Sequence, residues 1–187
     1  MKDLNIVFAG FGGQGILFAG KVVAYAGLIE GRELSWLPSY GPEMRGGTAN
    51  CSICLSDEPI GSPPVTETHL RFFLVTNPNV LIAMNRPSLD KFVNEVEPGG
   101  TILLDSSLID ERVERDDVTV FYVPASKLAE ENGLKGLANI ILVGKLRKEL
   151  AFCTEETLDK ALQKCIPARK ADMLGFNRKA LKIGKAQ

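Results

Sequence analysis

A glycine-rich stretch, Gly10-Phe11-Gly12-Gly13-Gln14-Gly15, lies between two apolar segments and constrains the fold most strongly. Residues 4–9 before it predict a short buried strand, and residues 16–29 after it predict a helix with a single charge, Lys21. The first N–H groups of a helix have no internal partners, and the helix dipole adds partial positive charge there. Glycine permits positive φ and lets a ligand come close. A strand, a glycine turn and a helix in this order therefore predict a site for a phosphate or another anion.

Gly10, Gly12 and Gly15 match the G-x-G-x-x-G pattern of dinucleotide-binding folds in the expected context. Such folds also place an acidic residue roughly 20 residues further on, at the end of the second strand, to hold a ribose. The second strand predicted here, residues 33–37, continues into Pro38-Ser39-Tyr40 with no acid at its end. The missing acid disfavours NAD. A phosphate-bearing ligand and a tight turn that only packs helix against sheet both remain open.

The composition predicts one globular domain without strong electrostatic bias. The chain has 187 residues and 45% hydrophobic content, which is enough for a sizeable core. The 22 basic side chains nearly balance the 23 acidic ones, so nothing favours nucleic acid or an anionic membrane as a partner. The longest uncharged run, residues 4–20, is broken by the glycine stretch and is a poor membrane span. The first strand follows Met1-Lys2-Asp3 at once, which leaves no room for a signal peptide, so we expect a cytoplasmic protein.

The cysteines and the single histidine do not form a recognisable catalytic or metal-binding set. Cys51 and Cys54 are spaced as C-x-x-C, but they lie in a predicted strand, where residues three apart point to opposite faces. We therefore expect buried strand cysteines instead of a redox or metal pair. His69 lies in a loop rich in threonine and proline, without a nucleophile and acid to complete a triad. No nucleotide-triphosphatase loop is present. The chain suits a subunit that binds a ligand for chemistry done elsewhere.

The remaining pattern alternates strands and helices and predicts a single α/β domain, with a largely parallel sheet flanked by helices, a Rossmann-like start and a helical C-terminal part. We expect further strands at residues 48–55, 70–75, 101–105 and 118–123. We expect helices at residues 78–96, 126–132, 137–150, 155–165 and 170–187.

Three details of these helices can be tested against the structure. Asn77 is expected to cap the helix over residues 78–96, with a break near Pro87 and a second cap at Ser88 as the alternative. Thr154 is expected to cap the helix over residues 155–165. The terminal segment is expected to dock through a few apolar side chains and to fray at its end; those anchors are Leu174, Phe176, Leu181 and Ile183.

A second candidate site is the loop over residues 39–47, which is too rich in proline and glycine for a regular element. It follows the second strand, which we expect to lie beside the first, so it should begin at the sheet edge where the glycine turn lies and where α/β sheets bind ligands. Its charged residues are Glu43 and Arg45, and Gly46 and Gly47 follow them. Arg45 could pair with a phosphate or carboxylate of a ligand. Contact with Glu43 or with a neighbouring subunit is an equal alternative.

Two long motifs resemble a known family. Gly10-Phe11-Gly12-Gly13-Gln14-Gly15-Ile16-Leu17 and Pro38-Ser39-Tyr40-Gly41-Pro42-Glu43-Met44-Arg45-Gly46-Gly47-Thr48 are similar to the gamma subunit of 2-oxoacid:ferredoxin oxidoreductases. Ser56-Asp57, Asn77-Pro78 and Pro98-Gly99-Gly100-Thr101 agree with it as well. The motif that begins at Trp36 looks most like the 2-oxoglutarate type, and a branched-chain, aryl or indole oxoacid remains the alternative.

The resemblance implies a multi-subunit enzyme that oxidatively decarboxylates a 2-oxoacid, with coenzyme A as acyl acceptor and ferredoxin as electron acceptor. It places thiamine diphosphate, Mg and the iron–sulfur clusters on partner subunits, namely alpha, beta and, where present, a ferredoxin-like delta subunit. It also implies that residues 10–15 hold the phosphates of coenzyme A, in agreement with the physics of a helix N-terminus. No residue matches a catalytic base or nucleophile of the family, so none is named.

Overall fold

The computed structural model describes residues 3–40, 48–58, 60, 75 and 77–187. Its strands are β1 (Leu4–Phe11), β2 (Glu33–Tyr40), β3 (Thr48–Ser56), β4 (Val80–Ala83), β5 (Thr101–Asp105) and β6 (Thr119–Val123). Its helices are α1 (Ile16–Ile29), α2 (Arg86–Phe92), α3 (Ala125–Glu131), α4 (Ala138–Leu150), α5 (Glu155–Cys165) and α6 (Met173–Ala186). Two short 3-10 turns, η2 (Val93–Glu95) and η3 (Ala168–Lys170), follow α2 and α5.

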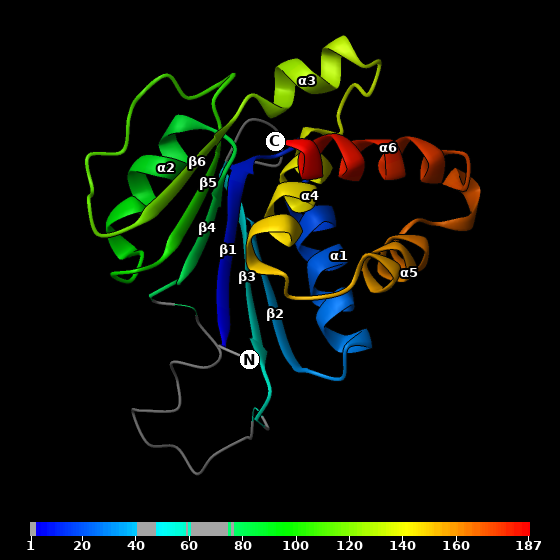
Figure 1. The fold of residues 1–187 in the computed structure, drawn as a ribbon, viewed down its shortest axis with the longest axis horizontal. Coiled ribbons are helices and arrows are strands. Elements are labelled where there is room, and N and C mark those ends of the chain that lie inside the picture. The colour runs from blue at the N-terminus through cyan, green and yellow to red at the C-terminus, as the bar shows by residue number, and fades with distance from the viewer. Residues whose placement is uncertain (1–2, 41–47, 59, 61–74, 76) are drawn as a thin grey trace.

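The six strands form one sheet in the order β2-β3-β1-β4-β5-β6 (Figure 1). β1, β4, β5 and β6 pair in parallel, whereas β3 is antiparallel to both of its neighbours. Five of the six strands therefore point the same way, and the predicted α/β fold with a largely parallel sheet is confirmed.

β3 lies between β1 and β2, which corrects the expectation that the second strand pairs with the first. The expected edge of the sheet is nevertheless right, because Gly10 and Tyr40 both pair with Ala49. β2 also continues past Leu37 to Tyr40 and includes Pro38. β2 is an edge strand, so the N–H that proline lacks need not be used by a further strand.

The segment after Asn77 begins with a strand, so the predicted helix over residues 78–96 is wrong in its first half, and the segment is helical only from Arg86. β4 occupies the centre of the sheet, with all four residues buried. The helix there is α2, whose N-cap is Asn85 in place of Asn77; the Asn85 Oδ1 accepts the Ser88 N–H at 2.8 Å. A four-residue apolar run has no readable period, so the sequence cannot separate it from the helix behind it. The central strand expected at residues 70–75 falls outside the described residues, apart from Val75.

Helices cover the two faces of the sheet unequally (Figure 1). α1, α4 and the other C-terminal helices share one apolar core with alternate residues of the strands, while α2 packs on β1 and β4 on the opposite face. α1 approaches β3 closely because two of its inner residues are glycines: a Cβ at Gly20 would collide with Cys51, and one at Gly27 with Leu55. The face of this helix that carries Gly20 and Gly27 therefore packs on the sheet.

Backbone contact docks α6 on α4, in addition to the apolar side chains expected for the terminal helix. A Cβ on Gly144 of α4 would collide with the Leu181 carbonyl, and one on Gly184 of α6 with the Ile141 carbonyl. Leu174, Leu181 and Ile183 pack against the core as expected, whereas Phe176 is half exposed. The helix continues to Ala186. Glycine lets the two helix backbones touch. The spacing of apolar residues in the sequence does not predict such a contact.

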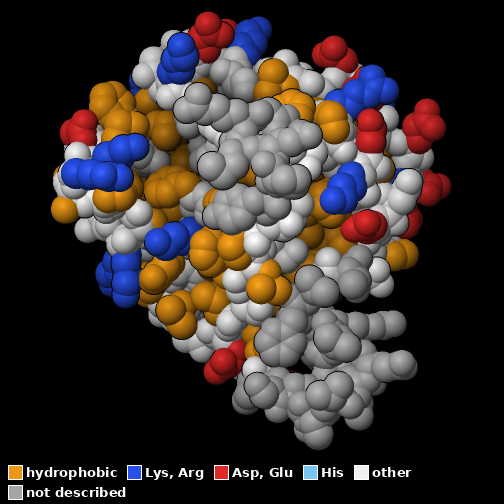
Figure 2. All heavy atoms as spheres, turned by 180° about the vertical axis from the view of Figure 1, so that it is seen from behind, with side chains coloured by type: hydrophobic (Ala, Val, Ile, Leu, Met, Phe, Trp, Pro, Cys, Tyr) orange, Lys and Arg blue, Asp and Glu red, His pale blue; other side chains and the backbone are white. Residues whose placement is uncertain are grey.

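The other predicted elements are confirmed to within one residue at their starts, except α6, which begins at Met173. Thr154 caps α5 as expected, since its Oγ1 accepts the Thr157 N–H at 3.0 Å. On the face drawn in Figure 2, both basic and acidic side chains occur around the margin. Among the described residues no helix is long and apolar enough to cross a bilayer.

Candidate functional site

The glycine turn joins the end of β1 to the start of α1 at the carboxyl edge of the sheet. Gly13 has φ 99° and Gly15 has φ 73°, values that other residues rarely adopt. Gly15 is the N-cap of α1 and makes no side-chain cap. No capping side chain therefore satisfies the first N–H groups of α1, which is the feature on which the predicted anion site depends.

The glycines of the turn are required for different structural reasons. A Cβ at Gly10 would lie 2.6 Å from the Ile16 Cδ1 and 2.7 Å from the Gln14 Oε1, and one at Gly15 would collide with Asn139. Close packing therefore explains these two. Gly13 is exposed, and a Cβ there would meet nothing within 4 Å, so packing gives no reason for it. The open space above Gly13 fits an anion held by backbone N–H groups.

Gln14 ties the ends of two parallel strands together. Its Oε1 accepts the Phe11 N–H at 2.6 Å, and its Nε2 donates to the Met84 carbonyl at 3.0 Å. Phe11 ends β1, and Met84 directly follows β4. Beyond these two strands the chain turns to opposite faces of the sheet, α1 to one and α2 to the other, which is the switch point where such sheets bind ligands.

A pocket of about 490 Å³ opens beside the turn. It is lined by Gly13, Gln14, Met84, Ser126, Ala129, Glu130, Lys135, Gly136 and Ala138. Ser126 is held by Asp105, a fully buried carboxylate at the end of β5 that accepts its N–H at 3.1 Å and its hydroxyl at 2.5 Å. Asp105 is not among the predicted site residues, although an acid at the carboxyl end of a buried parallel strand is a signal that the sequence contains.

A second depression, which we call the basic groove, has a volume of about 650 Å³ and lies behind the N-terminus of α1. Its walls come from α1, the start of α4 and the connection between α5 and α6. The lining residues are Gly15, Phe18, Lys21, Lys135, Gly136, Leu137, Asn139, Cys165, Ile166, Pro167, Arg169, Lys170, Asp172, Met173 and Asn177. Lys135 and Gly136 also line the first pocket, so the two depressions adjoin.

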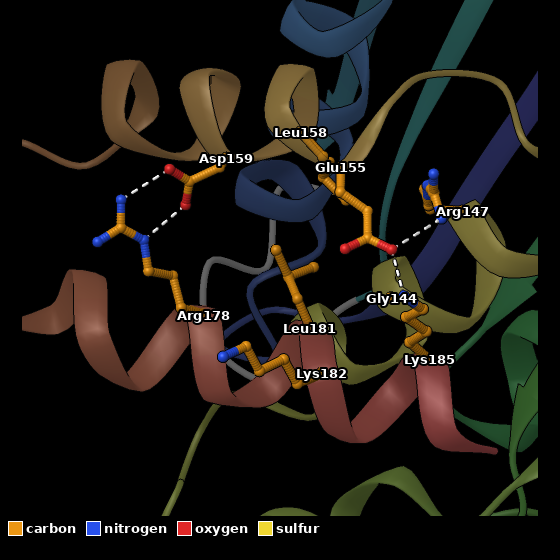
Figure 3. Close-up of a pocket in the computed structure, with 9 residues that line it drawn as sticks. All are labelled: Gly144, Arg147, Glu155, Leu158, Asp159, Arg178, Leu181, Lys182 and Lys185. Carbon is orange, nitrogen blue, oxygen red and sulfur yellow. Dashed lines mark hydrogen bonds and ion pairs between the residues drawn. The ribbon is translucent and has the colours of Figure 1, made fainter.

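A third depression, which we call the paired cleft, lies between α5 and α6 and has a volume of about 300 Å³ (Figure 3). Asp159 accepts two hydrogen bonds from Arg178, at 2.6 and 2.7 Å. Glu155 pairs with Lys185 and, at 3.3 Å, with Arg147. The pKa of the Glu155 carboxyl is lowered mainly by the Lys185 hydrogen bond, and that of Asp159 by the Arg178 hydrogen bonds.

The loop predicted as a second site, with Glu43, Arg45, Gly46 and Gly47, lies outside the described residues. The strands on either side of it are placed: β2 ends at Tyr40 and β3 begins at Thr48. Thr48 pairs with Phe11, at the very start of the glycine turn. Both ends of this loop therefore emerge at the same sheet edge as the turn.

Cys51 and Cys54 are buried on β3, as the strand prediction expects. Burial raises the pKa of the Cys51 thiol to about 12, so the thiol stays protonated and unreactive. Cys165 borders the basic groove, and burial raises its pKa to about 11. Among the described residues, no three side chains of the metal-ligating types come together in a way that could hold an ion.

The sheet order also explains the missing ribose acid. A dinucleotide fold needs a parallel strand beside β1 whose carboxyl end carries the acid. Here the strand on that side is β3, which runs the other way and places its first residue, Thr48, next to Phe11. The glycine pattern therefore stands in a sheet that lacks the usual ribose position.

Comparison with known proteins identifies the family to which this fold belongs. The family model described as pyruvate ferredoxin/flavodoxin oxidoreductase matches residues 5–187. The ketoisovalerate oxidoreductase subunit VorA of Methanothermobacter marburgensis is 40% identical over 143 residues, which cover 76% of this chain. The match spans only 28% of that relative's length. The 2-oxoglutarate synthase subunit KorC of Methanocaldococcus jannaschii is 32% identical over 179 residues, which are 93% of this chain and 90% of the relative.

Solved structures agree with these relatives. The gamma subunit of a keto/oxoacid ferredoxin oxidoreductase from Geobacter sulfurreducens superposes with a TM-score of 0.80 at 26% identity, over 98% of this chain and 95% of that one. The 2-oxoglutarate:ferredoxin oxidoreductase of Magnetococcus marinus, with 2-oxoglutarate, coenzyme A and succinyl-CoA bound, gives a TM-score of 0.83 at 26% identity. That match covers all of this chain and 31% of the larger one. The resemblance seen in the two sequence motifs is thereby confirmed, and the chain belongs to the pyruvate ferredoxin/flavodoxin oxidoreductase family.

Proposed function

We propose that this chain is the gamma subunit of a 2-oxoacid:ferredoxin oxidoreductase and contributes the phosphate-binding region for coenzyme A. The observation that carries the proposal is the glycine turn at the start of α1, with positive φ at Gly13 and Gly15, which opens onto a pocket of about 490 Å³. Family membership and the bound coenzyme A of the Magnetococcus marinus enzyme support the same assignment.

The residues of this chain bind and position the ligand. Backbone N–H groups at the start of α1 would hold phosphate oxygens, with the partial positive charge of the helix N-terminus behind them. Gln14 keeps the turn rigid through its two hydrogen bonds. Lys135 adds a positive charge at the pocket wall. Coenzyme A, when bound, supplies the thiol that accepts the acyl group, and this chain would orient that arm toward partner subunits.

The other cofactors belong to partners in this proposal. Thiamine diphosphate, Mg and the iron–sulfur clusters are assigned to alpha, beta and delta-type subunits, and ferredoxin takes the electrons, because the family resemblance implies this division. Cytoplasmic localisation remains a prediction of the same kind. Residues 39–47 are proposed to border the coenzyme A site or a partner subunit, and the Arg45→Ala complex should show which, by a changed KM or by lost assembly.

The first prediction concerns Gly13. In the co-expressed complex, Gly13→Ala places a methyl group over the anion site and disturbs the turn. The KM for coenzyme A should rise about 10- to 100-fold, the equivalent of one charge-assisted hydrogen bond of about 1.5–3 kcal/mol. Steady-state kinetics with saturating oxoacid and ferredoxin measures it.

Gly31→Ala is the matched control, because Gly31 also has positive φ and free space around it but lies beyond the other end of α1. Alanine at this position has a comparable backbone strain to alanine at position 13, but it lies away from the proposed site. Equal coenzyme A kinetics for the Gly13→Ala, Gly31→Ala and unmodified complexes would reject the proposed site.

The oxoacid is proposed to be 2-oxoglutarate, and a branched-chain oxoacid is the second candidate, since the 40% identical relative is a ketoisovalerate enzyme. A panel of 2-oxoglutarate, ketoisovalerate, pyruvate and indolepyruvate at equal concentrations separates these by kcat/KM.

A free-standing dinucleotide-binding protein is the other candidate class. Thermal shift with NAD, NADP and coenzyme A tests it, because a ligand of the folded state raises Tm.

A further inference from the structure

The C-terminal helix α6 has a basic outer face. α6 lies on the outside of the molecule, over α4 and beside α5 (Figure 1). Its exposed residues include four cations and no acid; they are Gly175, Phe176, Arg178, Lys179, Lys182, Lys185 and Ala186. We call this surface the outer face of α6. The face is open to another molecule and carries charge of one sign.

Only part of this charge is neutralised within the chain. Arg178 and Lys185 reach across to the acids of α5 (Figure 3). Lys179 and Lys182 form no ion pair with any described residue. The Lys179 ammonium donates to the Asn132 carbonyl at 2.9 Å, which leaves its charge unbalanced. Two cations of the outer face therefore remain available to an acidic partner.

Phe176 is the other unusual residue of this face. Its side chain is 49% exposed, and it is the only aromatic residue among the exposed large hydrophobic side chains of the described chain. The sequence predicts it as an anchor of the terminal helix, yet Leu174, Leu181 and Ile183 pack against the core and Phe176 does not. Lys179 is its neighbour at i+3 on the helix surface. An aromatic side chain at the centre and charges at the rim are typical of protein interfaces.

The shape of the face favours a protein partner over a small molecule. Phe176 and Lys179 line none of the three depressions described above, and Lys182 lines only the paired cleft. Small molecules bind in concave sites, whereas the ridge of a helix fits a groove in another protein. A Cβ on Gly175, next to Phe176, would meet nothing within 4 Å, so the wall of such a groove can approach the ring closely.

We propose that the outer face of α6 docks in an apolar groove with an acidic rim on a partner subunit of the same oxidoreductase, a proposal that rests on the proposed function above. Phe176 fills the groove, and Lys179 and Lys182 pair with carboxylates at its rim. A partner subunit is the expected occupant because the KorC relative, which this chain matches over 90% of its length, is a subunit of 2-oxoglutarate synthase. A second copy of this chain fits less well, since a symmetric contact would bring two basic faces together.

The first test measures how strongly the co-expressed subunits hold together. Phe176→Ala should raise the Kd for release of this chain from the complex about tenfold or more, as for an aromatic residue at the centre of an interface. The Tm of the isolated chain should not fall, because the side chain is half exposed. Leu28→Ala is the matched control, since Leu28 is 50% exposed but lies on α1. Dilution of the purified complex, followed by native mass spectrometry, gives the Kd.

The second test concerns charge. Lys179→Glu should raise the same Kd severalfold at low ionic strength, and the effect should disappear at about 0.5 M NaCl, where exposed charges are screened. Lys91→Glu is the matched control, because Lys91 is an exposed lysine of α2, on the opposite face of the sheet.

The other outcomes overturn the proposal and identify the alternative. An unchanged Kd in both variants would show that no subunit docks on this face. A raised KM for ferredoxin with intact assembly would assign the face to the soluble electron acceptor. A dimer of the isolated chain that Phe176→Ala abolished would assign it to a second copy. None of these results touches the proposed function, which the effect of Gly13→Ala on the KM for coenzyme A decides separately.

Discussion

Two depressions share helix α6, and their charges are arranged in opposite ways. In the paired cleft, Arg178 and Lys185 each meet an acid from α5, so most of the charge is neutralised within the protein (Figure 3). In the basic groove, at the other end of the same helix, four cations stand beside one acid and make no ion pair with a described residue. Both regions are rich in lysine and arginine, and only the partners differ.

The difference shows that a cluster of basic residues must be judged by whether each cation has an acidic partner. A bidentate pair such as Arg178 with Asp159 has its donors occupied, so it orients two helices and offers little to a ligand. Cations without partners retain their donors. The unused amide oxygens of Asn139 and Asn177 point the same way, since the protein leaves acceptors unsatisfied in the groove and not in the cleft.

The largest expected effect comes from displacing α6, because this helix lines both depressions. Gly184→Ala would push a Cβ into the Ile141 carbonyl and should destabilise the fold by about 1–3 kcal/mol or more. Gly175→Ala on the same helix meets nothing within 4 Å and should be neutral or stabilise by up to about 1 kcal/mol. Urea unfolding of the two variants measures both. Equal stabilities would show that backbone contact does not hold α6.

A smaller effect on stability is expected at Asn177, in the wall of the basic groove. Asn177→Leu removes an unsatisfied acceptor and keeps a similar volume, so the free energy of unfolding should rise by up to about 1 kcal/mol. If the hydrogen bond from the Asn177 Nδ2 to the Met173 carbonyl were the dominant effect, the variant would instead be less stable. Thermal unfolding of the variant and the unmodified protein distinguishes the two outcomes.

The smallest expected effect concerns pH and the paired cleft. The pKa of Asp159 is lowered in the folded chain, chiefly by the Arg178 hydrogen bonds. The pair therefore stabilises the fold above the unfolded-state pKa of about 3.9, and this stabilisation is lost as pH falls through the folded pKa. Asp159→Asn should lower Tm slightly at pH 7, and this Tm difference should shrink as the pH falls through the folded pKa. A Tm difference that grew on acidification would contradict this sign.

Local signals in the sequence determined a large part of the structure. The strand, glycine turn and helix over residues 4–29 are where the pattern places them, and Thr154 caps α5 as its position indicates. These features depend on neighbouring residues only: apolar runs, positive φ at Gly13 and Gly15, and a hydroxyl before a helix. The family resemblance is carried by the same short segments.

Long-range packing decided the rest. The insertion of β3 between β1 and β2, and the choice of β4 as a strand, depend on which neighbours complete the sheet, and a four-residue apolar run cannot reveal that. The basic groove is assembled from α1, the start of α4 and the start of α6. Its link between Asn139 and Gly15 joins residues 124 positions apart. No local pattern records such a contact, because it exists only once the helices have packed on the sheet.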